Sequence, residues 1–308
     1  MNSSQIITSF RKEIWEFKKT LFWVPLSIAI FIIAAPLLKL ILLEEHETAM
    51  LLDTITNADN LAHVEGFTRF FLTTIMGMFV PFIMSSLIIQ LYYFTTCLFD
   101  ERRDLSIYFW RSLPVSDVLS VIVKLFTGAL VVPAIFMLAA TFVVFVFLLL
   151  ALITCAVLSL GYDVSLWGLW GSANIISNLI SIWLNLLPYA LWMFPIFAWL
   201  MLTSMFANKA PFLWAILPVA AILLIESFVA GYLHLDGRIF FNTLREYFAF
   251  GQGMLLGNVT GTGTGTGTEP SPFTVFFALS SKISLPATLV GSGFMYMTYW
   301  FRVNRSHV

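Results

Sequence analysis

The sequence predicts an all-α integral membrane protein built as a bundle of six transmembrane helices. Of its 308 residues, 59% are hydrophobic and 11% are charged, whereas a soluble domain contains about 25% charged residues. The apolar residues also form long runs between charges, and a helix that crosses a bilayer needs roughly 20 of them. Lipid rather than water is therefore the expected solvent for much of the surface.

Each run gives one predicted span, and all six belong to a single transmembrane domain over residues 1–308. The third run is long for one upright helix, so we expect an outer extension, with a kink at Pro133. The six predicted spans are residues 21–43, 70–99, 119–150, 176–202, 212–232 and 283–301.

Orientation follows from the placement of Lys and Arg, which concentrate on the cytoplasmic side of membrane proteins. Most of the 16 Lys and Arg residues fall on the side that holds both termini, so both termini are predicted to be cytoplasmic. The residues expected on the outer side are Lys39, Arg69, Arg238, Arg245 and Lys282. The net charge of −1 argues against nucleic acid as a partner.

The N-terminal residues 1–20 predict an amphipathic elbow helix. Phe10, Ile14 and Phe17 recur at helical spacing, and the basic residues lie elsewhere around the helix. Such a helix lies in the headgroup plane, so the lipid bilayer is an expected partner. An elbow that binds a partner protein is the alternative.

The longest predicted outer loop, residues 233–282, contains several kinds of segment. Residues 236–250 predict a helix with an aromatic face, and the Gly/Thr tract 260–268 predicts a flexible linker. Residues 273–279 are apolar but too short to span, so we expect an interfacial or re-entrant segment. The loop is thus a helical and re-entrant excursion between spans five and six.

No motif for nucleotide binding or hydrolysis occurs in the chain. The patterns G-x-x-x-x-G-K-[ST], H-E-x-x-H and G-x-S-x-G are all absent, and the four His residues are scattered. We therefore expect no catalytic residue, no bound cofactor and no metal site in this chain.

Polar residues inside the predicted spans are candidates for a substrate pathway or a subunit seam. Asn174, Asn178, Ser181 and Asn185 share one helix face by their spacing. Interhelical hydrogen bonds, worth about 0.6 kcal/mol each, are the structural alternative. Glu226 is the sole carboxylate within a predicted span, and it is either protonated, paired or next to a wet cavity. A partly solvated structural role is the alternative for Glu226.

The loop of residues 100–118 carries the most specific pattern. A charged cluster ends the second span, an aromatic segment follows, and Leu-Pro-Val interrupts it. Ser116 is placed to cap the third span, and Asp117 is favourable to the dipole of that helix.

This loop resembles the permease subunits of type-2 ATP-binding-cassette exporters, in which an E-R-x-x-x-[ST] cluster runs into S-L-P-V-S. The motif covers residues 100–124, and the layout of the whole chain is similar. The resemblance implies a cytoplasmic coupling helix that contacts a separate ATPase subunit, which holds ATP and Mg²⁺. It also implies a second permease copy or a homologous permease, and location in a bacterial inner membrane. The implied interface residues are Glu101, Arg102, Arg103, Arg111, Ser112, Leu113, Pro114, Val115, Ser116 and Asp117.

Two other classes of function remain open. A self-contained secondary transporter is expected to have inverted repeats and broken helices near the midplane, and no clear repeat relates residues 21–159 to residues 160–308. A membrane-embedded enzyme would need an acid, a base and a nucleophile that converge, and the sequence offers no such set.

Overall fold

The computed structural model describes residues 3–42, 61–104, 116–161, 175–232, 238–249 and 273–304. Within these ranges every regular element is helical and no strand occurs. Five helical segments are long and apolar enough to cross a membrane, or six if one bent pair counts as a span. The predicted all-helical, multi-pass membrane class is therefore confirmed, while the identity of the membrane and the orientation stay predictions.

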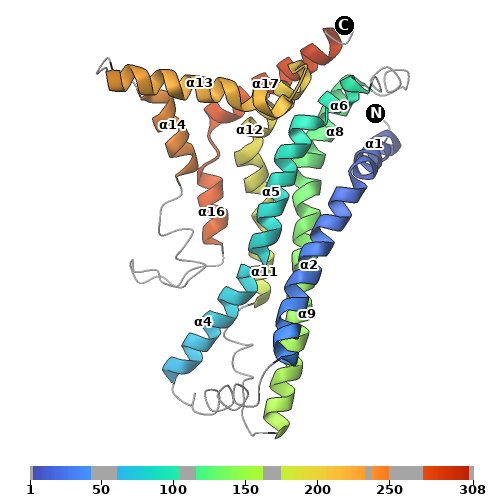
Figure 1. The fold of residues 1–308 in the computed structure, drawn as a ribbon, viewed down its shortest axis with the longest axis vertical. Coiled ribbons are helices and arrows are strands. Elements are labelled where there is room, and N and C mark those ends of the chain that lie inside the picture. The colour runs from blue at the N-terminus through green and yellow to red at the C-terminus, as the bar shows by residue number, and fades with distance from the viewer. Residues whose placement is uncertain are drawn as a thin grey trace.

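The N-terminal segment forms two helices that meet at Phe17. Helix α1 covers Ser3–Glu16 and helix α2 covers Lys18–Ile41. Helix α2 begins three residues before the predicted first span and packs along α9 (Val132–Gly161). In Figure 1, α1 lies at the same end of the bundle as the C-terminal end of the chain's last helix.

The second predicted span lies within one candidate span, residues 70–103, whose regular helix has a single-residue break. Helix α4 covers Leu61–Gly77 and α5 covers Phe79–Thr96, and the short α6 (Phe99–Arg103) follows. The break falls at Met78, which lies inside the predicted range 70–99. Hydropathy alone does not reveal it, because the residues on both sides are apolar.

The third span is longer than predicted and contains a π-helical turn. Helix α8 (Asp117–Phe126) passes through η1 (Thr127–Val131) into α9, without leaving the helical path. The irregularity precedes Pro133, the expected kink. Because Pro133 has no N–H to donate to the fourth carbonyl before it, a helix widens or bends at this place.

The fourth span, residues 175–206, has the same kind of single-residue break. Helix α11 (Ile175–Leu184) meets α12 (Leu186–Phe206) at Asn185. Helix α12 packs most extensively against α17 (Leu285–Asn304), the last helix. The apolar segment before α17 forms α16 (Thr274–Ser281), and the two axes are bent by 68°.

Helix α13 (Pro211–Tyr232) departs from the upright fifth span that its apolar run predicts. In Figure 1 it lies across the end of the bundle, whereas α5, α8 and α9 follow the long axis. Only 6% of its apolar window is buried, so few contacts hold it to the other helices. The turn into α13 places Ala210 at φ 48°, immediately before Pro211. Helix α14 (Ile239–Phe248) follows α13 and points back along the bundle.

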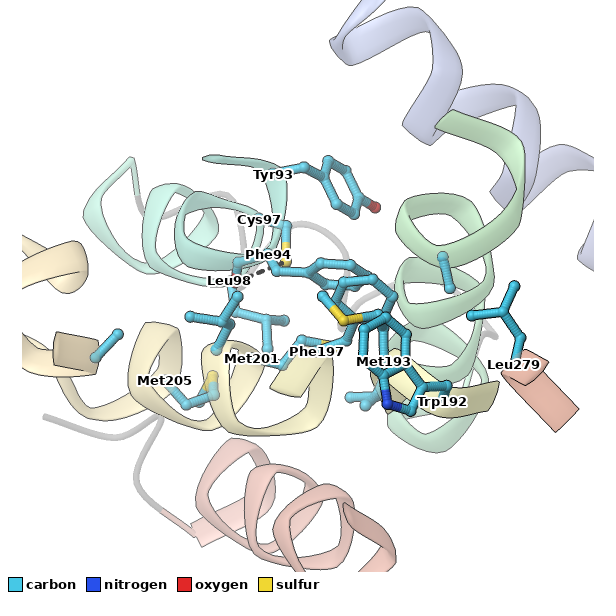
Figure 2. Packing of buried hydrophobic residues seen from close by; sticks show 14 residues of the cluster. Tyr93, Phe94, Cys97, Leu98, Trp192, Met193, Phe197, Met201, Met205 and Leu279 are labelled. Atoms are coloured by element: carbon cyan, nitrogen blue, oxygen red, sulfur yellow. Dashed lines mark hydrogen bonds between the residues drawn. The ribbon is translucent and has the colours of Figure 1, made fainter. Parts of the chain in front are cut away.

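Two apolar clusters hold the bundle together. The first joins α5 and α12, where Phe94 stacks on Phe197 with 4.5 Å between ring centroids (Figure 2). The second joins α2, α5 and α9 around Phe82 and Phe136, which are fully buried. Together the clusters fix the helices whose ends carry the charged residues described next.

Candidate functional site

Charged side chains from four helices meet at one end of the bundle, where the loop of residues 100–118, called the inner loop after its predicted orientation, begins and ends. We call these residues the ion cluster. Its members are Lys12 and Glu13 of α1, Glu101 of α6, Asp117 and Lys124 of α8, and Arg302 of α17, and Tyr93 of α5 contacts it.

Glu101 occupies the centre of the ion cluster. Its side chain is 2% exposed and pairs with three cations. Lys12 Nζ lies 3.0 Å from Glu101 Oε1, and Lys124 Nζ lies 3.2 Å from the same oxygen. Arg302 Nη1 lies 3.0 Å from Glu101 Oε2. Both carboxylate oxygens are thus paired, as a buried charge requires.

Arg302 connects the two ends of the inner loop. Besides its pair with Glu101, it places Nε 2.9 Å from Asp117 Oδ1, and Nη2 donates to Ser120 Oγ at 3.3 Å. Glu101 precedes residues 105–115 and Asp117 follows them. One guanidinium from the last helix therefore fixes both attachment points of the loop.

Glu13 brings the N-terminal helix into the same cluster. Lys124 Nζ donates to both oxygens of Glu13, at 2.9 and 3.0 Å, and the Tyr93 hydroxyl donates to Oε2 at 3.0 Å. Glu13 is 3% exposed and Lys124 is 0% exposed. Three cations and three carboxylates balance within the cluster, so no member carries an uncompensated buried charge.

Glu16, one turn after Lys12, lies at the edge of the ion cluster. Burial raises the pKa of the Glu16 carboxyl above its usual range. The positive charges of Lys124 and Lys12 partly offset this shift, and the carboxylates of Glu13 and Glu101 add to it. The Glu16 carboxyl therefore takes up a proton at a higher pH than an ordinary glutamate does.

Arg102 attaches the start of the loop to α12. Its Nη2 donates to the carbonyl oxygens of Ser204 at 3.0 Å and of Ala207 at 2.7 Å, which lie at the end of α12. The Ser204 hydroxyl in turn accepts from the backbone N–H of Phe99 at 2.9 Å. By contrast, Arg103 is exposed and pairs with Asp104 at 3.0 Å.

The far end of the loop begins a helix in the predicted way. Ser116 caps α8, because its Oγ accepts from the backbone N–H of Leu119 at 3.3 Å. The predicted cap is therefore confirmed, and Asp117 has a partner in Arg302 that the sequence pattern did not indicate. The remaining candidate interface residues, Arg111, Ser112, Leu113, Pro114 and Val115, lie outside the described residues, as does Asn174.

The described candidates for a substrate pathway lie on different helices, with Asn178 and Ser181 on α11 and Glu226 on α13. Ser181 is buried on α11, Asn178 is half-buried, and Asn185 lies at the break between α11 and α12. Glu226 instead faces α14, where its carboxylate accepts from the backbone N–H groups of Phe240 and Phe241, the latter at 2.8 Å. These are the hydrogen bonds of the Glu226 side chain within the described ranges, and through them Glu226 caps the start of α14.

Single residues of the ion cluster stand out in the sequence, although their partners do not. Lys124 interrupts a long apolar run and Arg302 ends one, and ionisable residues in such runs call for a partner. Glu13 is an acid among the basic residues of α1. Which partner each takes depends on packing between helices that are remote in the chain.

A second polar arrangement, around the π-helical turn, was also missed. Gln90 Nε2 donates to the Gly128 carbonyl at 2.9 Å, and the Tyr189 hydroxyl donates to Gln90 Oε1 at 2.8 Å. A Cβ at position 128 would overlap the ring of Phe94, so only Gly permits this approach of η1 to α5. Among the described residues, no group of three His, Cys, Asp or Glu side chains is arranged to hold a metal.

Comparisons with known protein families, with curated proteins and with solved structures gave no match in any of the three. The chemistry of this chain therefore has to be argued from its own residues. The ion cluster pairs each of its three carboxylates with at least one cation. Its geometry is suited to holding the loop, α1 and α17 in one arrangement.

Proposed function

We propose that this chain is the permease subunit of a type-2 ATP-binding-cassette exporter. In this proposal it forms the substrate path with a second permease copy or a homologous permease in a bacterial inner membrane. Both termini are cytoplasmic, and a separate ATPase subunit binds ATP and Mg²⁺. The chain itself contributes no catalytic group.

The observation that carries the proposal is the attachment of the inner loop at both ends by buried polar contacts. A permease without a nucleotide site must be moved by a conformational change in its ATPase partner, transmitted through a contact surface. A loosely held loop would move by itself and would not transmit that change to the transmembrane helices. Glu101 and Asp117 are joined through Arg302, and Arg102 is bonded to the end of α12. A displacement of the loop by the ATPase subunit would thus be transmitted to α8, α12 and α17 together.

The sequence of the loop supports the same function. The E-R-x-x-x-[ST] cluster and the S-L-P-V-S segment resemble those of exporter permeases, and Leu113 and Pro114 provide an apolar wedge between charges. Apolar anchors at the centre of an interface contribute over about 2 kcal/mol each, and rim charges contribute less. Arg103 and Arg111 are the rim candidates in this arrangement.

The decisive experiment is purification of the tagged chain from its native membrane in mild detergent. We expect a P-loop ATPase at a fixed stoichiometry, identified by mass spectrometry, with ATP hydrolysis that responds to substrate in nanodiscs. Leu113→Asp should lose the ATPase or uncouple hydrolysis. The matched control is Leu160→Asp, the same change at an 89% exposed position at the far end of α9, and it should retain both.

Two results would overturn the proposal. One is a Leu113→Asp variant that binds and couples its ATPase like the unchanged chain. The other is transport by the purified chain alone in liposomes, driven by an ion gradient, which is the behaviour of a secondary transporter.

A further inference from the structure

Helix α1 has two faces of different character. One face carries Lys12 and Glu13 into the ion cluster, where Glu13 is 3% exposed. The opposite face points away from the bundle, and we call it the outward stripe. Its members, spaced three or four residues apart and continuing into α2, are Ile7, Arg11, Trp15, Lys18 and Phe22.

The outward stripe exposes large apolar and aromatic side chains. Ile7 is 67% exposed, Trp15 is 63% exposed and Phe22 is 58% exposed. Trp is enriched where a membrane protein meets the headgroups, because its ring is apolar and its N–H is polar. A contiguous exposed apolar surface of this kind on a helix indicates that a membrane or another protein contacts it.

The basic residues of the stripe are grouped around the exposed indole. Arg11 Cζ lies 5.6 Å from the centre of the Trp15 ring, and Lys18 Nζ lies 5.4 Å from it. Within the described part of the chain neither Arg11 nor Lys18 forms an ion pair, in contrast to Lys12 on the other face. Two cations without carboxylate partners are thus presented beside an aromatic ring.

Continuity with α2 indicates which partner covers the stripe. Phe22 and the adjacent Trp23, which is 64% exposed, lie in the apolar segment Lys18–Lys39, a candidate membrane span. The stripe therefore runs directly into a surface that meets the hydrocarbon of the bilayer. The buried pairs of Lys12 and Glu13 prevent α1 from rolling about its axis and hiding the stripe.

We propose that the outward stripe of α1 binds anionic phospholipid headgroups, with Trp15 at the headgroup level and Arg11 and Lys18 on the phosphates. Basic residues next to a membrane surface each favour anionic over zwitterionic lipid. Because the same helix holds Glu13 in the ion cluster, bound anionic lipid also stabilises the end of the bundle where the inner loop is attached. This inference depends on the membrane location and not on the transport activity.

The test uses the full chain purified in a neutral detergent and titrated with phosphatidylglycerol or phosphatidylcholine. We expect phosphatidylglycerol to raise the midpoint of thermal unfolding and phosphatidylcholine to have little effect. In the variant with both Arg11→Gln and Lys18→Gln, half of the maximal shift should require about thirtyfold more phosphatidylglycerol, since each lost cation weakens attraction to an anionic surface about fivefold. The control is Lys209→Gln, which removes one positive charge at an exposed position in another loop. Its lipid titration should match that of the unchanged chain.

Circular dichroism of the double variant shows whether it remains helical, and Trp15→Ala provides an independent variant that keeps both cations. We expect Trp15→Ala to weaken the response less than the double variant does. Equal responses to the two lipids, or an unchanged titration for the double variant, would overturn the proposal. Loss of a dimer by the double variant in light scattering, without a change in lipid response, would show that a second copy covers the stripe.

Discussion

Arg302 and Glu101 form a buried ion pair at 3.0 Å although 201 positions separate them in the chain. Both side chains are 2% exposed, and Arg302 reaches Asp117 on the other side of the inner loop as well. This pair joins the last helix to the start of the loop that we propose as the coupling element.

Removing Arg302 should therefore weaken the whole inner end of the bundle. Arg302→Gln leaves Glu101 and Asp117 short of a cation, and breaking a buried pair costs about 3–5 kcal/mol. We expect a loss of that order in the free energy of unfolding, measured by denaturant titration in micelles. The control Arg103→Gln removes the same charge at an exposed position and should leave the free energy of unfolding nearly unchanged.

A double-mutant cycle separates the pair from its surroundings. Because Arg302→Gln and Glu101→Gln remove the two sides of one contact, the double variant should lose less stability than the two single losses combined. The difference should be about 0.5–3 kcal/mol, the range for residues in one network. Strict additivity would mean that the two side chains do not interact in the folded protein.

The raised pKa of Glu16 makes the contribution of the N-terminal helix to stability depend on pH. Its folded pKa is raised, mainly by burial, so the folded state holds the proton more tightly than the unfolded state does. The stability contributed by this group therefore falls as the pH rises from the ordinary range of Glu through the raised value. Glu16→Gln should raise the melting temperature at pH 7.5 relative to the unchanged chain.

The same comparison at low pH provides the check on Glu16. Below about pH 4.3, the ordinary pKa of Glu, the carboxyl is protonated in both states, so the advantage of the glutamine should vanish. A benefit of Glu16→Gln that is independent of pH would exclude the electrostatic cause.

The helices could be predicted from the sequence because charged residues mark the ends of the apolar runs. The length of each run therefore gives the approximate length of the helix. The predicted range 212–232 differs from α13 by one residue at its start. Its direction across the end of the bundle could not be predicted, since nothing in a uniformly apolar run distinguishes an upright helix from a transverse one. The break at Met78 was hidden for the same reason.

The candidate site was predictable only in part. Glu101, Arg102 and Asp117 were found because they belong to a local pattern. Lys124 interrupts an apolar run and Arg302 ends one, and their pairing depends on the packing of α8 against α1 and against α17. A pattern read along the chain carries no information on contacts across it, so the ion cluster needed the structure.

Glu226 should prove structural, and this outcome can be measured directly. Its carboxylate accepts from the first backbone N–H groups of α14, which would otherwise lack partners within the helix. In Glu226→Ala the amides of Phe240 and Phe241 should exchange with deuterium about tenfold faster. Glu246→Ala, on an exposed face of the same helix, is the control and should leave those amides unchanged. A loss of transport with unchanged amide exchange would restore Glu226 to the substrate path.

Gln90 should be the residue that holds the π-helical turn in place. Gln90→Leu keeps the side chain's approximate volume but leaves the Gly128 carbonyl and the Tyr189 hydroxyl without their partner in a buried place, at about 1–3 kcal/mol for each group. Tyr189→Phe removes one hydroxyl and should cost about 1 kcal/mol. Combined with Gln90→Leu, Tyr189→Phe should cost little more, because the phenylalanine leaves no unsatisfied hydroxyl.

Deuterium exchange over Thr127–Val131 should rise in Gln90→Leu and change little in Tyr189→Phe, since the hydrogen bond from Gln90 to Gly128 remains in the latter variant. If the exchange over this turn were the same in all three proteins, the turn would owe its geometry to Pro133 alone, and the contact with Gln90 would be incidental to it.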